Sequence, residues 1–237
     1  MSEPTGAQRR AVEIGRALTW TWQAFRPNAG AFMGLAIITV LLTAAQQIGT
    51  TSIQNVLLDC VNPQSPGQEN ACKVALSPAG LAPIGVAVAL VFLAYISQIG
   101  VVRGALGATR GVRPGITDLI ESRNFGRYAL YVIVYRILFF VGIALCILPG
   151  LLVLVFLQFG QYFVLDRGMS VVQAMKASAS LASRHLAPVT TVALIAAVLE
   201  LVGGILYGLP MLVTLPLASL FVANVYRQLT EQPAAEG

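Results

Sequence analysis

Two charged residues, Arg136 and Glu200, lie inside long apolar stretches of the sequence, and their types could support chemistry there. If these stretches are membrane-spanning helices, Arg136 lies roughly 13 Å past Arg127 along the helix axis. Glu200 then lies roughly 21 Å past Leu186, which we place at the same side of the membrane as Arg127. A charge at mid-bilayer costs about 2.5–3.5 kcal/mol, and a partner of opposite sign lowers this cost. We therefore predict that both side chains face the bundle interior, as a pair or around one polar cavity.

Two interpretations of these charges stay open. An ion pair could fix the packing of two spans, or the charges could form a site for a substrate or a proton, a frequent role of ionisable residues inside membranes. Amide side chains add further polar groups to the spans: Gln46, Gln47, Gln98, Gln158, Gln161 and Asn224. Hydrogen bonds between helices are the role we favour for them, with a polar path as the alternative.

Signatures of enzymes are absent from the sequence. His185 is the only histidine, and no zinc-protease motif, serine-hydrolase elbow or phosphate-binding loop occurs. Carboxylates do not cluster as ligands for a divalent metal. We therefore expect no catalysis, no cofactor and no metal site.

The composition is that of a membrane protein. Of the 237 residues, 57% are hydrophobic and 11% are charged, and the mean hydropathy is +0.77. Soluble domains carry about 25% charged residues. The net charge of +5 does not indicate nucleic-acid binding, because no basic face with interleaved aromatic residues appears.

The apolar stretches predict an all-α, polytopic membrane protein with six transmembrane helices. We expect one membrane domain over 1–228 and a polar tail over 229–237. An amphipathic helix over 8–25 should lie along the cytoplasmic membrane surface, with packing against the protein as the alternative. An extracytoplasmic loop is expected over 49–80, and the expected spans are 29–48, 81–103, 128–148, 149–165, 186–206 and 209–226.

The spans are predicted to form three hairpins, each preceded by a cytoplasmic amphipathic helix. The returning span of each hairpin starts near a proline, at Pro83, Pro149 and Pro210, and reaches an arginine. Proline suits the first turn of a helix, where its missing N–H costs nothing. Ser170 and Gln173 should form a capping box ahead of the third hairpin. The apolar face of the amphipathic helix that begins at this capping box should hold Val171, Val172, Met175, Ala179 and Ala182.

Gly100 and Gly104 form a small-residue pair near the end of the second span, so we propose them as a helix-packing contact.

Basic residues divide unevenly between the two sides of this layout. Lys73 alone falls outside, and Arg136 lies within a span. The other thirteen fall inside: Arg9, Arg10, Arg16, Arg26, Arg103, Arg110, Arg113, Arg123, Arg127, Arg167, Lys176, Arg184 and Arg227. The positive-inside rule then places both termini in the cytoplasm.

This orientation has consequences for export and for the cysteines. No apolar segment near the start resembles a secretory signal, so we expect the first span to direct insertion. Cys60 and Cys72 lie in the predicted outer loop, where an oxidising compartment favours a disulfide; a metal site is the alternative.

The stretch from Leu148 to Val189 resembles a group of bacterial six-helix membrane proteins of unknown function. They are related to the membrane domain associated with glycerophosphoryl diester phosphodiesterases. The resemblance rests on Pro149-Gly150, Asp166, the segment 174–178, Pro216 and Tyr226, and on the opening segment ALTWTWQAFRPN. It implies a six-helix membrane fold. The resemblance does not extend to a phosphodiesterase domain, so that activity is not implied.

These observations favour a non-catalytic protein of the bacterial inner membrane with an accessory, scaffold or envelope-maintenance role. The alternative is a small transporter or lipid-handling protein that uses an intramembrane site at Arg136 and Glu200. The expected partners are the lipid bilayer, anionic lipids and another membrane protein.

Overall fold

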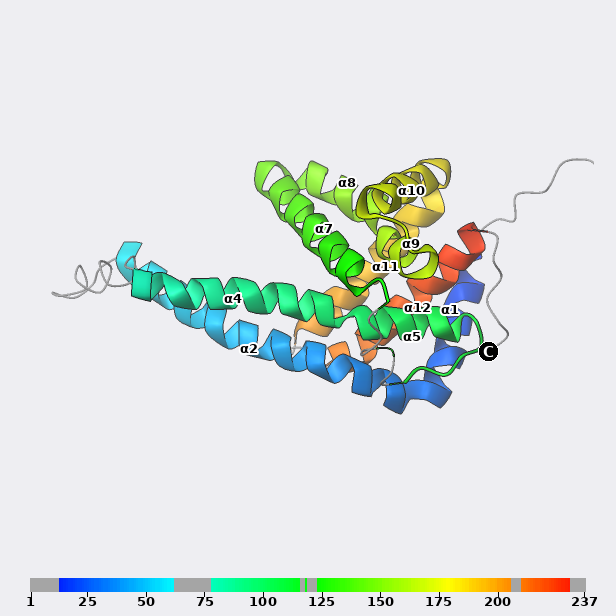
Figure 1. The fold of residues 1–237 in the computed structure, drawn as a ribbon, viewed down its shortest axis with the longest axis horizontal. Helices are drawn as coiled ribbons and strands as arrows, with labels where there is room; N and C mark the ends of the chain where they lie inside the picture. The colour runs from blue at the N-terminus through cyan, green and yellow to red at the C-terminus, as the bar shows by residue number, and fades with distance from the viewer. Residues whose placement is uncertain (1–12, 62–77, 116–117, 119–122, 206–209, 231–237) are drawn as a thin grey trace, which may run out of the picture.

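The computed structural model describes residues 13–61, 78–115, 118, 123–205 and 210–230. Its regular elements over these residues are all helical (Figure 1). They are α1 (Ile14–Phe25), the 3₁₀ turn η1 (Arg26–Asn28), α2 (Ala29–Val61), α4 (Pro78–Ser97), α5 (Ile99–Ala108), α7 (Phe125–Leu145), α8 (Ile147–Leu157), α9 (Gly160–Arg167), α10 (Val171–Arg184), α11 (Leu186–Ile205) and α12 (Met211–Leu229).

Six stretches of helix are long and apolar enough to cross a membrane, which indicates a multi-pass membrane protein. A helix suits the membrane interior because it satisfies its own backbone hydrogen bonds where no water is present. Consecutive helices pack most closely as the pairs α2 with α4, α7 with α8, and α11 with α12. The first pair extends away from the rest of the molecule, and α7 diverges from it at an angle (Figure 1).

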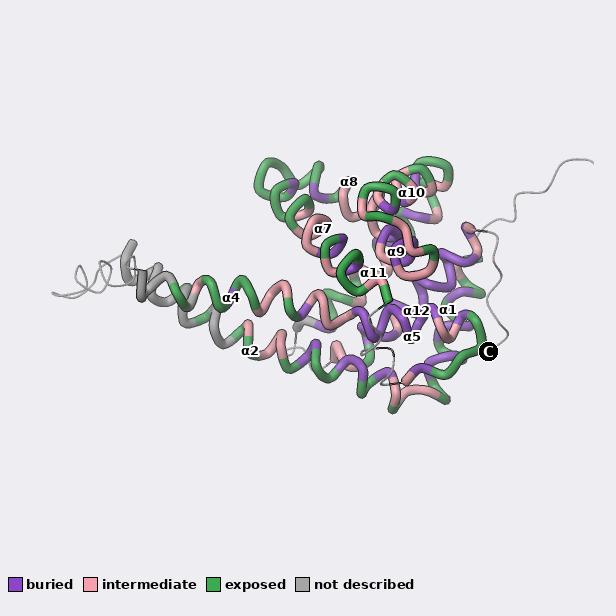
Figure 2. The backbone as a smooth tube through the Cα atoms, viewed as in Figure 1, coloured by how far each residue is buried: buried purple, intermediate pink, exposed green. Residues whose placement is uncertain are grey.

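Helix α12 is the centre of the molecule. Within its apolar stretch 72% of residues are buried, against 22–33% in the other five candidate spans. It packs against α1, α2, α5 and α11. Buried residues concentrate on α12 and α5, whereas those of α7, α8 and the described part of α4 are mostly exposed or half-buried (Figure 2). Most spans therefore present their side chains to the bilayer, while α12 presents its own to other helices.

Several predicted boundaries need correction. Helix α2 continues to Val61 and α4 begins at Pro78, so both ends of the predicted 49–80 loop are helical. The predicted span 81–103 is two helices separated at Gln98. The predicted span 149–165 is likewise divided, at Gln158 and Phe159. Apolar length predicts that a segment crosses the membrane, but it does not show where the helix is interrupted.

The first helix packs on the protein with one face, which was the alternative to a helix lying only on the membrane surface. Ala17, Trp20 and Ala24 are buried, and α1 packs on α12. The Glu13 N–H also donates to the Gln228 side-chain carbonyl at 3.1 Å. Leu18 and Trp22 are 43% and 52% exposed. The helix thus meets the protein with one side and leaves an apolar edge open beside it.

The capping box of α10 is confirmed. The Gln173 N–H donates to Ser170 Oγ at 3.4 Å, and the Ser170 N–H donates to the Gln173 side chain at 3.1 Å. The expected apolar face is shifted, because Val172 is exposed while Ala174, Ser178 and Ala182 are buried. These small residues allow α10 to pack on α8 and α9.

Candidate ligand-binding pocket

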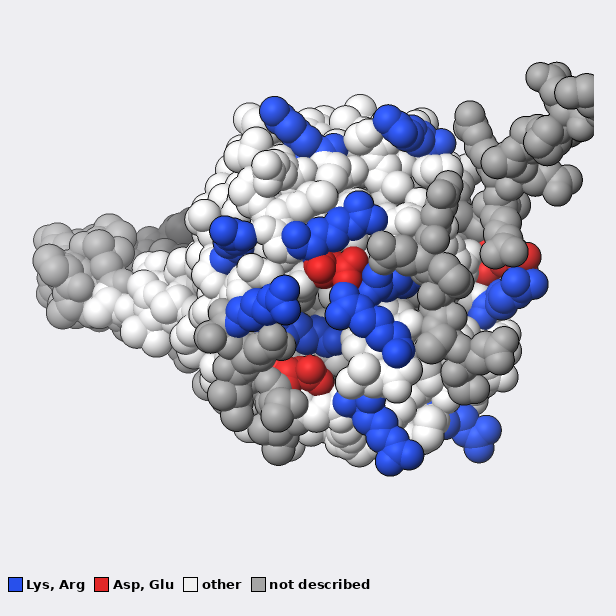
Figure 3. Space-filling view, turned by 45° about the vertical axis from the view of Figure 1, so that its right-hand side comes forward, with Lys and Arg blue, Asp and Glu red and all other residues white. Residues whose placement is uncertain are grey.

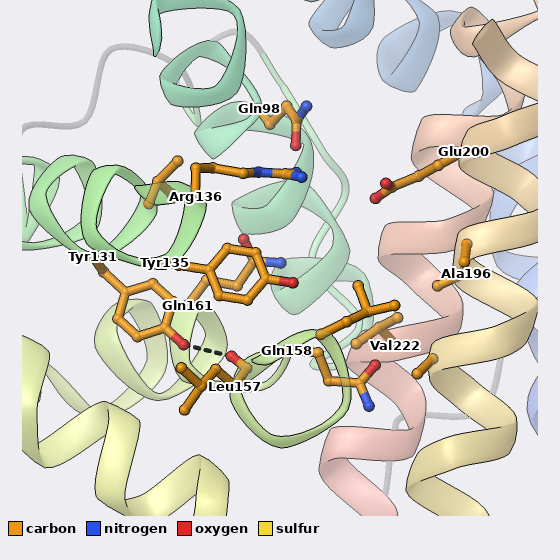
Figure 4. A pocket seen from close by; sticks show the side chains of 14 residues that line it. Gln98, Tyr131, Tyr135, Arg136, Leu157, Gln158, Gln161, Ala196, Glu200 and Val222 are labelled. Carbon is orange, nitrogen blue, oxygen red and sulfur yellow. Dashed lines mark hydrogen bonds between the residues drawn. The ribbon is translucent and has the colours of Figure 1, made fainter. Parts of the chain in front are cut away.

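A pocket lies where the helix pairs meet, and both predicted site residues line it (Figure 4). Its cavity volume is about 80 Å³. A water molecule needs about 10–15 Å³ by this measure, so the cavity has room for a few water molecules or a small polar group. Side chains from α7, α8, α9, α11 and α12 form the wall together with Gln98: Tyr131, Val132, Tyr135, Arg136, Leu154, Leu157, Gln158, Gln161, Ala193, Ala196, Ala197, Glu200 and Val222.

Both helix interruptions fall at this pocket. Gln98 separates α4 from α5, and Gln158 with Phe159 separates α8 from α9. Interrupted spans free backbone groups at membrane depth, and such groups are tolerated where they line a cavity or are buried in protein. The dihedral angles of Gln98, Gln158 and Phe159 stay in the right-handed helical region, so each interruption is a local break within one continuous span.

Side chains from neighbouring helices support the interruptions. The Tyr131 hydroxyl donates a short hydrogen bond to the Leu157 carbonyl, at the last residue of α8. The Gln158 amide donates to the Val189 carbonyl of α11 at 3.0 Å. At the other interruption, the Ser97 hydroxyl lies 2.7 Å from the Thr39 hydroxyl of α2. The pocket wall is therefore tied to three different helices.

Arg136 extends from α7 into the pocket with its guanidinium between aromatic rings. Its central carbon lies 3.7 Å from the centre of the Tyr95 ring and 5.5 Å from that of Tyr135. Such cation–π contacts stabilise a desolvated charge. The Arg136 Nε is buried and has no hydrogen-bond partner among the described residues. The rings thus lie beside the guanidinium, and the end of the side chain faces the cavity (Figure 4).

Glu200 reaches into the same space from α11. Its carboxylate points toward the Arg136 guanidinium from the opposite wall (Figure 4). The two residues, both within the described part of the chain, do not form a direct ion pair: the described ion pairs join Arg16 to Glu13 and Arg110 and Arg227 to Asp166. The structure therefore brings the predicted charges to one cavity and leaves space between them.

The remaining predicted site residues are placed as follows. Gly104 packs against α2, since a Cβ there would lie 3.2 Å from Leu35 Cδ1 and 3.3 Å from Phe32 Cε1. Gly100 is buried on the same helix. Cys72 and the side chain of Cys60 lie outside the described residues, so the disulfide stays a prediction. No three His, Cys, Asp or Glu side chains gather as metal ligands in the described ranges.

A second polar cluster, which the sequence did not predict, surrounds Asp166 at the end of α9. Arg227 donates to its two carboxylate oxygens at 2.9 and 3.2 Å, and the Tyr226 hydroxyl donates at 3.1 Å. Arg110 adds a short ion pair, and Arg227 Nε donates to the Thr109 hydroxyl at 3.1 Å. The available signal was Asp166 itself, an acidic residue among the basic ends of the spans.

Comparison with known proteins gives bacterial relatives without a described role. The chain is 26% identical over 233 residues to an uncharacterized protein of Mycobacterium bovis, a match that covers 96% of this chain and 71% of the relative. Two uncharacterized proteins of Mycobacterium tuberculosis match with the same identity and coverage. No family model and no solved structure matches the chain. The similarity to the phosphodiesterase-associated membrane domain therefore stays a prediction.

Proposed function

We propose that this chain is a multi-pass protein of the bacterial cytoplasmic membrane that binds and handles a polar solute or lipid in the pocket of Arg136 and Glu200. One observation carries the proposal: two opposite charges face each other across a cavity at the interruptions of two spans. A charge within a membrane span is costly without a partner, and a ligand of opposite charge lowers that cost.

The accessory or scaffold role expected from the sequence rested on the lack of a polar cavity beyond one charge pair. The pocket weakens that argument, because Gln98, Gln158, Gln161 and two tyrosines join the charges in its wall. The proposal is one of binding and movement without covalent chemistry.

The orientation belongs to the same proposal. Among the described residues, Lys and Arg side chains group on the face where α5, α9, α10 and α12 end, and few Asp and Glu side chains lie there (Figure 3). The positive-inside rule supports a cytoplasmic position for this face and for both termini. We further propose three hairpins, each preceded by an amphipathic cytoplasmic helix, with α1 and α10 as the first and third of these helices.

The test is purification of the full chain from native membranes in mild detergent, followed by mass spectrometry of bound lipids, solutes and proteins. Wild type is compared with Arg136→Ala and with Arg184→Ala, an exposed arginine on α10 away from the pocket. We expect a specific small molecule that is lost in Arg136→Ala, still folded by size-exclusion chromatography, and kept in Arg184→Ala. A stoichiometric protein partner that persists in both variants, without a small ligand, would instead establish the accessory role.

A further inference from the structure

The charges of the pocket also define the kind of ligand. We propose that the ligand is a zwitterion, whose oxyanion binds Arg136 and whose hydrogen-bonding alkylammonium group binds Glu200. This inference rests on the proposed function and adds the chemical class of the ligand to it. A phosphate ester of ethanolamine has this chemistry, either as a lipid headgroup or as a free solute.

The first argument is the balance of charge. The pocket wall contains one cationic and one anionic side chain, on opposite sides and without a direct ion pair. A purely anionic ligand would bring its charge against Glu200, and a purely cationic ligand would bring its charge against Arg136. Repulsion between like charges in one site disfavours such ligands. A ligand with both charges, separated by a short linker, satisfies both side chains at once.

The second argument is the orientation of Arg136. Tyr95 and Tyr135 lie against its guanidinium, with Tyr95 at 3.7 Å from the central carbon to the ring centre. Aromatic contacts use the face of the guanidinium plane, so they leave the N–H donors at its edge for hydrogen bonds. That edge is a rigid fork that matches a carboxylate or a phosphate. The end of Arg136 is therefore prepared for an oxyanion.

The third argument is the surroundings of Glu200. Its carboxylate faces the cavity, and the amides of Gln98 and Gln161 belong to the same wall. Carboxylate and amide oxygens accept hydrogen bonds, and a primary ammonium group offers three N–H donors. A quaternary ammonium offers none and relies on aromatic faces instead. We therefore expect ethanolamine to be preferred over choline.

The experiment measures binding to the full chain in detergent by native mass spectrometry. Three lipids with the same acyl chains are compared: phosphatidylethanolamine, phosphatidylcholine and phosphatidylglycerol. Free phosphoethanolamine, phosphocholine and glycerol phosphate form a second set. Because hydrogen bonds to charged groups contribute about 1.5–3 kcal/mol, we expect the ethanolamine compound to bind about tenfold to a hundredfold more tightly than its counterparts. Equal binding of the free compound and the lipid would identify a solute, and binding of the lipid alone would identify a lipid headgroup.

Substitutions then assign the two ends of the ligand. Glu200→Gln should abolish the preference for ethanolamine over glycerol while binding persists. Arg136→Gln should weaken the binding of all three lipids. The matched controls are Glu13→Gln and Arg16→Gln, since both residues are more than half exposed and lie on or beside α1, away from the pocket. Where Arg136→Gln does not fold, Arg136→Lys keeps the charge and should reduce oxyanion binding through loss of the fork.

Two outcomes would overturn the proposal of a zwitterionic ligand. In the first, phosphatidylglycerol binds more tightly than phosphatidylethanolamine, and its binding depends on Arg136 but not on Glu200. This result would leave the proposed function intact and would make the ligand anionic. The second outcome concerns stability without ligand. If each single charge reversal destabilises the protein and the double variant Arg136→Glu with Glu200→Arg restores its stability, the two residues form a structural ion pair. Absence of binding by every compound would contradict the proposed function as well.

Discussion

At the scale of single residues, Asp166 shows how a charge can be kept inside the protein at the end of a span. Its side chain is 4% exposed, and that of Arg227 is 5% exposed. The carboxylate accepts from Arg227, Tyr226 and Arg110, so its oxygens are well supplied with donors. These contacts join the C-terminal ends of α9 and α12 to Arg110, which follows α5.

We predict that Asp166→Asn lowers the free energy of unfolding by about 3–5 kcal/mol, since loss of one partner leaves a buried charge uncompensated. Thermal unfolding in detergent, followed by size-exclusion chromatography, measures the effect. Arg110→Gln is the control, because that arginine side chain is 53% exposed and an exposed ion pair contributes about 0–1 kcal/mol. Equal unfolding temperatures for the two variants would show that burial of the Asp166 cluster contributes nothing.

Single residues were also the part of the site that the sequence predicted best. Arg136 and Glu200 stand out because charges are rare inside apolar stretches, and both line the pocket. Tyr95, Tyr131 and Tyr135 did not stand out, because aromatic residues are common in spans and at membrane interfaces. Their role depends on which residues of other helices face them, and a single sequence does not record these neighbours.

At the scale of elements, the interruptions of two spans decide the shape of the pocket. The segments 90–98 and 154–163 both begin with the sequence LVFL, but their helices are interrupted at different places: at Gln98, five residues after this sequence, and at Gln158, directly after it. The repeat was visible in the sequence, but the interruption was not. Hydropathy averages over a whole span, whereas an interruption depends on the side chains that satisfy a few backbone groups.

Gly160, the first residue of α9, makes one interruption testable. A Cβ at this position would collide with the ring and hydroxyl of Tyr131, whose hydroxyl binds the Leu157 carbonyl. We predict that Gly160→Ala destabilises the protein by about 1–3 kcal/mol, the usual effect of overpacking. It should also weaken ligand binding in the pocket, because Tyr131 must move.

The matched control is Gly34→Ala in α2. Nothing lies within 4 Å of a Cβ at Gly34, so alanine should be neutral or stabilising by about 0.5–1 kcal/mol. Thermal unfolding in detergent compares the two variants. If Gly160→Ala were as stable as Gly34→Ala, the close contact between α9 and Tyr131 would not constrain this wall of the pocket.

At the scale of the whole molecule, the sequence predicts six spans in three hairpins but does not predict which span lies at the centre. Apolar side chains that face lipid and those that face protein look alike to a hydropathy scale, so the central place of α12 was not foreseen. A weak signal did exist: α12 has the lowest mean hydropathy of the six candidate spans, and it contains Thr214, Ser219 and Asn224. Small and polar residues in a span indicate contact with other helices.

The orientation of the whole molecule can be tested by labelling in spheroplasts with a membrane-impermeant maleimide. Cys60, Cys72 and Cys146 are replaced by serine, and one cysteine is introduced at a time. Arg16→Cys and Arg184→Cys, at exposed positions of α1 and α10, should react only after the membrane is permeabilised, because the proposed orientation puts the basic face in the cytoplasm. Cys72, restored alone, should react in intact spheroplasts. The opposite pattern would invert the topology and would place the residues that separate α2 from α4 in the cytoplasm, where a stable disulfide between Cys60 and Cys72 is not expected.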